Sequence, residues 1–340
     1  MNTTWYQDTI IDDGPIISAR VRLARNIKKY PFRPKLMDDQ AKLLVEEATL
    51  AATAGHFRVM DPAEYSDIDK RMFLEKHIIS HEFVKDDLPK GLLLADDFNA
   101  SIMINEEDHI RIQTIRPGDD ITASWEEANR IDDLLEENVE FAFDKEYGYL
   151  TACPTNVGTG MRASFMIHLP MLDKTGQLKN MLSAISKFGI AIRGIYGEGS
   201  ESMGGIFQIS NQVTLGRSEQ DIIQGLQSVA KNVIDKEKWL REKMLEKHRL
   251  DVENNIWRAY GVLTHSRKAT VKEAMEMLSE IRQGYLLGVL DMPKPSKSIY
   301  QIMMEVQPGH LLKVSGQDLE ETELDIARSK YLRETFRGNN

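Results

Sequence analysis

Apolar positions along the chain follow two spacings, one typical of strands and the other typical of helices. Helical spacing with an acidic first turn marks residues 38–54, and helical patterns return at 122–139 and 178–188. Residues 1–35 are predicted to form a loop with a basic insert. Strands are predicted at 91–95, 101–105, 110–115, 163–169, 189–193 and 205–210, with shorter candidates at 141–143 and 149–152.

The connections between the predicted strands are short and polar. Asn99 marks a turn between the strands at 91–95 and 101–105, which favours antiparallel pairing. A loop rich in turn residues follows at 153–160. The first part of the chain is therefore predicted to be a domain that mixes helices and strands.

The pattern changes near Ser218 and stays helical to the end of the sequence. Ser218 is a predicted N-cap followed by acidic residues, and Thr270 with Glu273 forms a capping-box pattern. Strand signals are few beyond this point. We therefore expect two domains joined by a helix, residues 1–250 with helices and strands and residues 255–340 with helices alone.

Composition indicates a globular, cytoplasmic protein with a full core. Of 340 residues, 41% are hydrophobic and 28% are charged, and the formal net charge is −10. A negative chain is not expected to bind nucleic acid or an anionic membrane non-specifically. No apolar run approaches the ~18 residues of a membrane span, and no secretory signal is visible at the start. The single cysteine, Cys153, excludes an intrachain disulfide framework and suits a reducing compartment.

Common nucleotide-binding motifs are absent from the sequence. There is no G-x-x-x-x-G-K-[ST] segment, and the H-R-D and D-F-G motifs of ordinary protein kinases are missing. No G-x-G-x-x-G joins a strand to a helix, and no histidine pair forms H-E-x-x-H. The sequence therefore excludes a P-loop and an ordinary protein-kinase site.

Arginines recur in extended or glycine-rich contexts. Arg20 and Arg22 share one side of an extended segment, because alternate residues of such a segment lie on the same face. Arg111, Arg162 and Arg193 follow in strand or glycine-rich positions. If they converge, they form a cage for a polyanion, since a planar guanidinium binds phosphate oxygens bidentately and glycines let backbone N–H groups approach. Any one of them taken alone is better explained as a solvated surface arginine.

Carboxylates and the cysteine supply two further candidates. Glu106, Glu107 and Asp108 lie together at a predicted strand end, and Glu198 lies in a glycine-rich loop. An exposed acidic turn is the alternative interpretation. Cys153 precedes a proline and has an arginine nearby in sequence, and positive surroundings favour a thiolate. The alternative for this residue is a buried, unreactive side chain.

Five segments in order resemble the catalytic domain of the phosphagen (guanidino) kinases. The resemblance covers roughly residues 15–220 and implies an α+β fold, an antiparallel sheet flanked by helices. It also implies reversible phosphorylation of a guanidinium nitrogen by ATP with Mg²⁺. The matching segments are Ser18–Asn26, Asn105–Arg111, Cys153–Ser164, Arg193–Glu198 and Ile209–Asn211.

The resemblance also implies a role for each matching position. Glu107 and Glu198 match the catalytic carboxylates, of which one accepts a proton as the N–P bond forms, and Cys153 matches the active-site cysteine. His77 resembles the histidine at the nucleotide site, with His81 as its competitor. The metal is expected to bind through the nucleotide phosphates and water, without ligands from the protein. The implied ATP-binding residues are Ser18, Ala19, Arg20, Val21, Arg22, His77, Arg111, Arg162, Ala163, Ser164, Phe165, Met166, Arg193, Gly194, Ile195, Tyr196 and Gly197.

The two ends of the chain point to a particular substrate. Only 17 residues precede Ser18, whereas kinases of small guanidino metabolites carry a helical domain there. Extra helical residues lie instead at 255–340. This arrangement resembles the bacterial protein-arginine kinases (McsB type), which phosphorylate arginine side chains, mark proteins for a Clp protease and regulate a stress-response repressor. The resemblance also implies a homodimer and a zinc-binding activator protein as partner.

One feature of those kinases is altered in this sequence. They carry R-D-x-x-R-A near the C-terminus as a phosphoarginine sensor. Here Asp325 and Arg328 match the motif, but Leu324 replaces its first arginine. An ordinary amphipathic helix at 322–335 is the alternative interpretation of this segment.

Three functions remain open at this point. The first is a protein-arginine kinase, the second is a kinase of a small free guanidino compound, and the third is a non-catalytic adaptor that binds arginine or phosphoarginine. The short segment before Ser18 counts against the second function. The presence of Glu107, Glu198 and Cys153 counts against the third.

Overall fold

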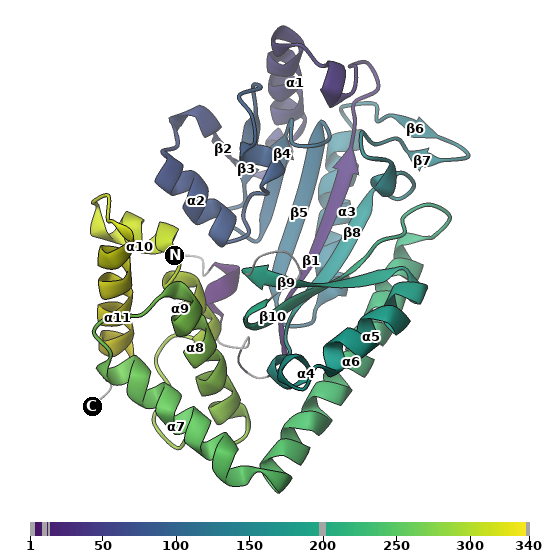
Figure 1. Ribbon diagram of the computed structural model, residues 1–340. Helices are drawn as coiled ribbons and strands as arrows, with labels where there is room; N and C mark the ends of the chain where they lie inside the picture. Colours follow the sequence, from purple (N-terminus) through teal and green to yellow (C-terminus); the bar gives the residue numbers. More distant parts are fainter. Residues whose placement is uncertain (1–3, 9–11, 13, 197–201, 338–340) are drawn as a thin grey trace.

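An antiparallel sheet lies at the centre of the structure (Figure 1). The computed structural model describes residues 4–8, 12, 14–196 and 202–337. Within these residues the strands of the large sheet follow the order β2-β3-β4-β5-β1-β8-β10-β9, and each neighbouring pair is antiparallel. The strands are β1 (Ile16–Arg25), β2 (Arg58–Met60), β3 (Gly91–Leu94), β4 (Ala100–Ile104), β5 (Ile110–Pro117), β8 (Met161–His168), β9 (Ile190–Tyr196) and β10 (Ser202–Asn211).

Helices surround the sheet and make up most of the C-terminal part. A separate small hairpin of β6 (Phe143–Asp144) and β7 (Gly148–Tyr149) projects beyond the sheet (Figure 1). The helices before residue 250 are α1 (Asp38–Ala51), α2 (Asp67–Glu75), α3 (Ile121–Glu136), α4 (Pro170–Lys174), α5 (Gln177–Ile185) and α6 (Glu219–Lys247). Those that follow are α7 (Arg249–His265), α8 (Val271–Leu286), α9 (Ile299–Glu305), α10 (Pro308–Ser315) and α11 (Glu321–Arg337).

Strand β1 lies in the middle of the sheet, between β5 and β8, so the prediction of a loop over residues 1–35 is wrong. Ala19 and Val21 are fully buried and alternate with the half-buried Arg20 and Arg22. This is the two-residue period of a strand. The hydrophobic pattern did not predict this strand, because Arg20 and Arg22 occupy alternate positions on its second face, where a strand buried on both faces would carry apolar residues.

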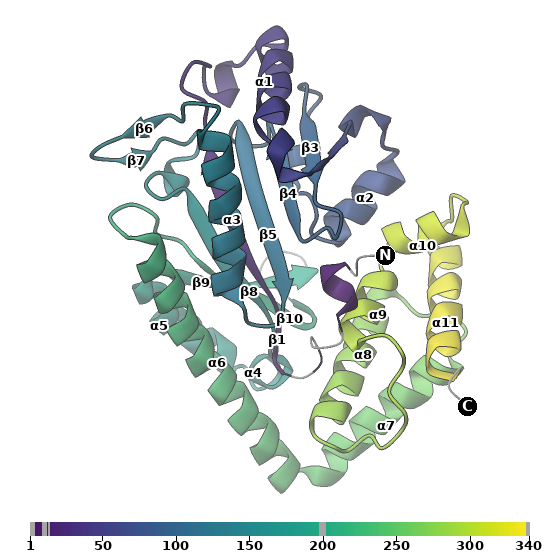
Figure 2. The same cartoon turned by 180° about the vertical axis from the view of Figure 1, so that it is seen from behind.

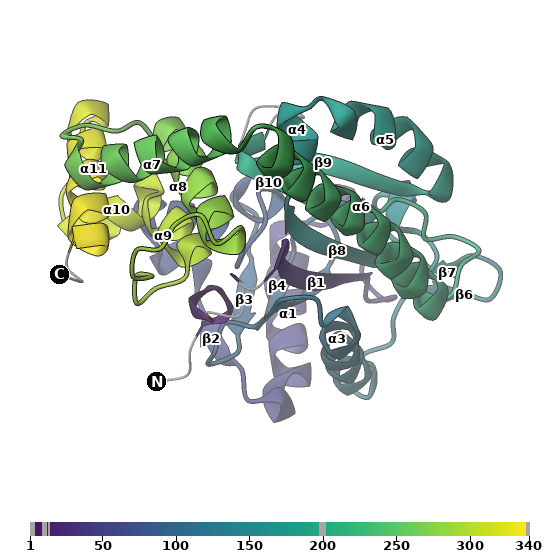
Figure 3. The same ribbon diagram turned by 90° about the horizontal axis from the view of Figure 1, so that it is seen from below.

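One face of the sheet is apolar and carries the main core. Figure 2 shows α1 and α3 in front of this face, and Figure 3 shows α5 and α6 running along its other half. Burial of apolar area from water is the chief force that holds these layers together. The buried side chains include Val21, Ile112, Phe165 and Ile209 from the strands and Leu44, Ile131 and Leu226 from the helices.

The opposite face carries two apolar clusters with polar side chains between them. In the C-terminal cluster, Ile115, Met166 and Ile206 of the sheet pack with α8, α9 and the short 3-10 helix Trp5–Gln7. In the α2 cluster, Leu92, Leu94 and Met103 pack with α2 and the segment after it. The C-terminal helices therefore share a core with the sheet and border the polar part of its face.

Most predicted elements occur where the sequence placed them. Ser218 caps α6, since its Oγ accepts a hydrogen bond from the Asp221 backbone N–H (3.1 Å). Thr270 Oγ1 accepts the corresponding bond from Glu273 N (3.1 Å) at the start of α8. The helical chain breaks between α6 and α7, near the predicted boundary at residue 250, and the division into two domains stays a prediction. Among the described helices, none has both the length and the apolar character to cross a membrane.

A buried ion pair fixes one end of β1. The Arg25 Nε and Nη2 atoms donate hydrogen bonds to Asp132 Oδ2 of α3 (3.1 and 2.7 Å), and Nη1 donates to the Thr159 carbonyl (3.0 Å). The guanidinium also lies 3.5 Å from the centre of the Tyr149 ring. The two charged side chains are only 1% and 6% exposed. Arg25 therefore ties the central strand to a helix and to the chain that enters β8.

We expect Asp132→Ala to lower the free energy of unfolding by about 3–5 kcal/mol, because it leaves the Arg25 guanidinium buried without its counter-charge. Urea unfolding followed by circular dichroism measures this loss. Arg58→Ala is the matched control, since the exposed Arg58–Asp96 pair (3.3 Å) should contribute less than about 1 kcal/mol. A loss for Asp132→Ala no larger than that of the control would contradict the expectation.

Candidate active site

Five arginines gather on the polar part of the second sheet face. Arg22 of β1 lies opposite Arg162 of β8 in the strand ladder, and Arg111 of β5 lies opposite Ala24 of β1. Arg193 of β9 lies opposite Gln208 of β10, and Gln208 Oε1 accepts a 2.6 Å hydrogen bond from Arg20 Nη2. The predicted convergence is therefore present, and it comes from neighbouring strands of one sheet.

The charges of these arginines act on one another. Burial lowers the pKa of Arg22 well below its ordinary value, and the charges of Arg20, Arg111 and Arg162 lower it further. The pKa of Arg162 is lowered by burial and by Arg193 and Arg111. Such a concentration of like charge attracts a polyanion.

Several donors of the cluster are left without partners. The Nε atoms of Arg22, Arg111 and Arg162 are buried and have no hydrogen-bond partner in the described part of the chain. Buried donors are almost always paired in proteins, so each such atom calls for an explanation. Phosphate oxygens would pair all three and would balance the positive charge. The arrangement therefore fits the phosphates of a nucleotide.

The turn between β4 and β5 is held rigidly by Asn105. This residue has a left-handed backbone (φ 60°), and its Nδ2 atom donates to the carbonyls of Ala41 (3.2 Å) and Pro89 (2.7 Å). Its backbone N–H donates to the His109 carbonyl (2.8 Å) and closes the turn. The two glutamates between these residues are therefore presented in a fixed direction.

Asp108 and His109 serve to hold the same turn in place. Asp108 Oδ1 accepts hydrogen bonds from Asn26 Nδ2 (2.7 Å) and Ala152 N (2.6 Å). His109 Nε2 lies 3.0 Å from the Pro31 carbonyl, so this nitrogen carries the proton. Burial lowers the pKa of His109 to about 4 and keeps the ring neutral. Both side chains are fully buried and act as anchors.

The two glutamates of the turn have different environments. Burial favours the neutral form of Glu106, but Arg111 and hydrogen bonds from Ser80 and the Glu107 N–H outweigh it, and the pKa of Glu106 is lowered. Burial and the Glu106 charge raise the pKa of Glu107. Glu107 Oε2 also accepts a long hydrogen bond from Asn156 Nδ2 (3.4 Å). A pair of carboxylates with pKa values pushed apart is typical of acid–base sites.

Cys153 lies on a loop beside these groups. It is half-buried at the start of the 3-10 helix Pro154–Asn156, with its Sγ atom 3.0 Å from Thr155 Oγ1. Arg162 interacts electrostatically with both Cys153 and Glu107, so the three groups are close together. The loop is fixed by Thr214, whose Oγ1 donates to the Val157 carbonyl (2.6 Å).

His77 lies at the other side of the cluster. It follows α2 with a left-handed backbone (φ 56°), and its carbonyl accepts a 2.8 Å hydrogen bond from Gln113 Nε2. Burial and the nearby charges of Arg20, His81 and Arg22 lower the pKa of His77 to about 3. His81 is exposed. The structure thus places His77 beside the arginines, as the resemblance implied for the nucleotide site.

The remaining predicted nucleotide residues fall into three groups. Ser18, Ser164 and Met166 lie on the arginine face, and the buried Ser18 Oγ has no partner in the described residues. Gly197 and Glu198 lie outside the described residues, as does the side chain of Tyr196, while Gly194 and Ile195 continue β9. The other group points into the apolar core on the far face, where its side chains do not reach the arginines: Ala19, Val21, Ala163 and Phe165.

Sequence reasoning missed Asn156 and Gln208, which hold Glu107 and Arg20. Both are amides, and neither stood out beside its charged neighbours. The only available signal for Asn156 was its place three residues after Cys153, and for Gln208 its place in a predicted strand.

Asp325 and Arg328 lie far along the chain in α11 and are nearly fully buried. Arg328 Nη1 donates to Asp325 Oδ1 (2.6 Å) and to the Ala269 carbonyl (2.8 Å), and Nε donates to the Val306 carbonyl (2.8 Å). The pair therefore joins three segments of the C-terminal helices. These bonds use the Nε and Nη1 donors of Arg328, so the side chain has a structural role in this part of the chain.

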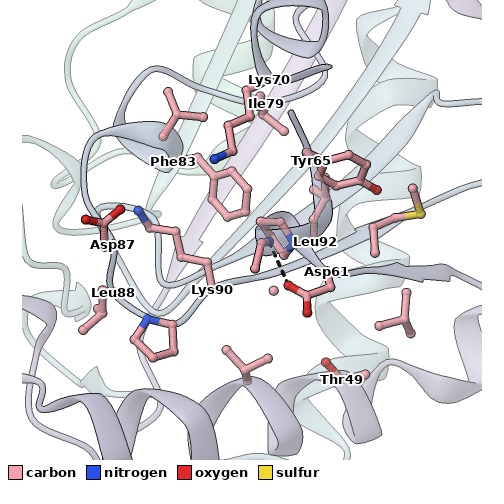
Figure 4. Close-up of a pocket in the computed structure, with 18 of the residues that line it drawn as sticks. Thr49, Asp61, Tyr65, Lys70, Ile79, Phe83, Asp87, Leu88, Lys90 and Leu92 are labelled. Carbon is pink, nitrogen blue, oxygen red and sulfur yellow. Dashed lines mark hydrogen bonds between the residues drawn. The ribbon is translucent and has the colours of Figure 1, made fainter. Parts of the chain in front are cut away.

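A cavity of about 650 Å³ lies apart from the arginines (Figure 4). Its wall contains residues of α1, α2, β2 and β3 and of the segments between them, among them Tyr65, Phe83 and Leu92. None of the five arginines lines it, and neither do Glu107 and Cys153. The cavity is therefore separate from the arginine face.

Comparisons with known proteins give the family. The model "ATP:guanido phosphotransferase, C-terminal catalytic domain" matches residues 40–240, and "Protein-arginine kinase McsB C-terminal domain" matches residues 249–340. Relatives named protein-arginine kinase from Caldanaerobacter subterraneus subsp. tengcongensis and Geobacillus sp. (strain WCH70) are each 42% identical. The alignments cover 94% of this chain and 96% of the first relative, and 98% and 94% for the second. The chain belongs to the protein-arginine kinase family.

Solved structures confirm the fold class. The substrate-free duplicated taurocyamine kinase from Schistosoma mansoni is 27% identical with a TM-score of 0.61, and the match covers 69% of this chain and 35% of that one. A lombricine kinase is 24% identical with a TM-score of 0.60 and supports the fold alone, over 71% of this chain and 70% of the other. The resemblance to the phosphagen kinases is therefore confirmed, as is a fold with an antiparallel sheet flanked by helices.

The arginine cluster should cost stability in the absence of an anion. The pKa of Arg22 is lower in the folded protein than in the unfolded chain, so protonation of Arg22 opposes folding. This cost is present wherever the unfolded arginine is protonated, including pH 7. We expect Arg22→Gln to raise the free energy of unfolding by about 1 kcal/mol.

Urea unfolding at pH 7 without phosphate or sulfate measures this gain. Arg116→Gln is the control outside the cluster and should change stability by less than about 0.5 kcal/mol. Added inorganic phosphate should stabilise the wild type more than the Arg22→Gln variant. A variant less stable than the wild type in anion-free buffer would show that the cluster is not strained by its own charge.

Proposed function

We propose that this protein transfers a phosphoryl group from ATP to arginine side chains of proteins. The observation that carries the proposal is the arrangement of five arginines, three with unpaired buried Nε atoms, beside a carboxylate with a raised pKa. Phosphoryl transfer depends mainly on positioning and charge stabilisation, which such a site supplies. The family supports arginine as the acceptor.

Bound Mg²⁺-ATP supplies the phosphoryl group, with the metal held mainly through the phosphates and water. The forked guanidinium groups of Arg20, Arg22, Arg111, Arg162 and Arg193 bind and align the phosphates and neutralise their charge. His77, Ser18 and Ser164 lie on the same face and border the nucleotide. The five arginines lie on four strands of one sheet, β1, β5, β8 and β9, so their backbone positions are set before the nucleotide arrives.

Glu107 acts on the acceptor. A substrate guanidinium has a pKa above about 12 and is not nucleophilic at pH 7. Glu107 holds the fork of the guanidinium and takes a proton from it as the N–P bond forms, while the bond between the γ-phosphorus and the β–γ bridging oxygen of ATP breaks and ADP leaves. Its raised pKa makes it a better proton acceptor than Glu106, which is committed to Arg111 and Ser80. Asn156 orients Glu107, and we assign Glu198 and Cys153 as further contacts to the guanidinium.

The wider role follows the family. We propose that the phosphorylated proteins are directed to a Clp protease, that a stress-response repressor is a target, and that a zinc-binding protein activates the kinase. A cytoplasmic homodimer is part of the same proposal. Asp325 and Arg328 are the candidate phosphoarginine sensor. The similarity of residues 249–340 to the C-terminal domain of protein-arginine kinases supports this set of roles.

Phosphate transfer to arginine tests the proposal directly. The protein is incubated with Mg²⁺-ATP and either free arginine or a basic, partly unfolded protein, and acid-labile phosphate on arginine is measured by mass spectrometry. Transfer to the protein supports the proposal. Transfer to free arginine alone would identify a kinase of a small guanidino compound, and no transfer to either would favour a non-catalytic adaptor.

We expect Glu107→Gln to lower kcat by about 10²–10⁴-fold and to change KM for ATP by less than about twofold, because the residue acts on the acceptor and not on the phosphates. The wild-type kcat should fall as pH is lowered through the raised pKa of Glu107, which must be deprotonated to accept the proton. Stopped-time phosphotransfer assays across pH measure both.

Glu82→Gln is the matched control, because Glu82 is an exposed carboxylate close enough to interact with Glu107. It should keep kcat within about twofold of the wild type. Full kcat in the Glu107→Gln variant would disprove the assigned role.

A further inference from the structure

Helix α10 is joined to α2 by a buried carboxylate. The Gly309 backbone N–H donates to both oxygens of Glu75 (3.0 and 2.9 Å), the last residue of α2. The first turn of a helix has free N–H groups and a partial positive charge, which suit an anion. The Glu75 side chain is only 14% exposed. Helix α10 of the C-terminal part therefore binds the end of α2, which lies next to it (Figure 1).

The contact leaves no space for a larger residue at position 309. A Cβ atom on Gly309 would lie 2.6 Å from Glu75 Oε2 and 2.9 Å from the Met72 backbone nitrogen. An outer ion pair, Lys313–Asp69 (2.6 Å), joins the same two helices but has a lysine side chain that is 53% exposed. The contact at Glu75 is thus the more buried of the two.

The end of α2 leads directly to the nucleotide side of the candidate site. His77 follows Glu75 by two residues and takes the left-handed conformation that ends the helix. Its carbonyl accepts the Gln113 side-chain bond, and Gln113 lies opposite Arg22 in the ladder. A shift of α2 would therefore move His77 relative to Arg20 and Arg22.

A second contact links the same region to α9. The Trp5 ring lies 6.5 Å from the His77 ring and 5.8 Å from the Tyr300 ring, measured between centroids. Tyr300 in turn donates its hydroxyl to Met166 Sδ (2.9 Å) on the arginine face. The C-terminal helices thus reach His77 by two routes. Helix α10 contacts the end of α2, just before His77, and Tyr300 of α9 contacts Trp5, which lies next to His77.

We propose that Glu75 is a positioning residue for the nucleotide site: its contact with α10 holds the end of α2 and keeps His77 beside Arg20 and Arg22. The inference rests on the proposed function in that the bound ligand is a nucleotide. It makes the C-terminal helices part of the nucleotide site, in addition to any role with protein substrates. Nucleotide affinity then depends on a contact that no residue of the arginine face makes.

The test measures the Kd of Mg²⁺-ADP by calorimetry on the full-length protein, together with KM for ATP and KM for the protein substrate. Glu75→Ala and Gly309→Ala break the contact from its two sides. Each should weaken ADP binding and raise KM for ATP by about five- to tenfold, with KM for the protein substrate unchanged. Lys313→Ala is the control, since its exposed ion pair should matter by less than about twofold.

Several readouts separate positioning from a general loss of structure. Circular dichroism and thermal unfolding show whether each variant is folded, and Glu75→Gln, which keeps an oxygen acceptor for Gly309, should recover part of the affinity. The double variant should be no weaker than either single variant, because both remove the same contact. Unchanged ADP affinity in folded Glu75→Ala and Gly309→Ala would overturn the inference, as would an equal rise in both KM values.

The outcomes also separate this inference from the proposed function. A wild-type protein that binds ADP but transfers no phosphate would disprove the function, while the ADP affinities of the variants would still decide the role of Glu75. A wild-type protein that binds no ADP would overturn the inference.

Discussion

Mutual repulsion among the arginines on one sheet face is the constraint on which the rest of the structure depends. Arg20, Arg22 and Arg162 lie on adjacent strands. Burial and the charges of Arg20, Arg111 and Arg162 lower the pKa of Arg22, and burial and the charges of Arg193 and Arg111 lower the pKa of Arg162. Long cationic side chains on a flexible loop would separate and leave the site. Strands with fixed ladder positions prevent this, because a side chain on a paired strand cannot leave its face without a change of register. In the proposed function, bound phosphates would offset this repulsion and pair the buried Nε donors of Arg22, Arg111 and Arg162.

The arginine face buries little apolar area itself, so the apolar clusters around it must stabilise the sheet. The main core covers the opposite side of the sheet, while the α2 cluster and the C-terminal cluster cover the two ends of the arginine face. Arg25, three residues after Arg22 on the same strand, is fully buried because Asp132 balances its charge. Arg22 and Arg162, in contrast, keep buried Nε donors without a partner in the described residues.

The sequence predicted the antiparallel strands, the long helices and the convergence of the five arginines, since period and turn residues are local signals. Strand β1 was missed because its arginines replaced the apolar half of the usual alternation. Ala19 and Phe165 were expected at the nucleotide, but their side chains lie in the core on the other face of the sheet. A sequence motif contains consecutive residues, and consecutive residues of a strand point to opposite faces. The sequence did not distinguish the roles of the acidic residues in the turn. The hydrogen bonds of Asp108 and His109 in the structure show that these two side chains hold the turn in place. Contacts between distant segments, such as Gly309 with Glu75, have no sequence signal at all.

The turn from Asn105 to His109 shows how a fold makes two identical side chains different. Glu106 and Glu107 are adjacent, and the same arginine, Arg111, acts on both. Glu106 has further donors in Ser80 and a backbone N–H, so its charge is stabilised and it serves the arginines. Within the described residues Glu107 accepts one long hydrogen bond, from Asn156, and it has a negative neighbour, so its charge is the less stable of the two. A cation beside Glu107 would relieve that instability, which is consistent with the guanidinium acceptor of the proposed function.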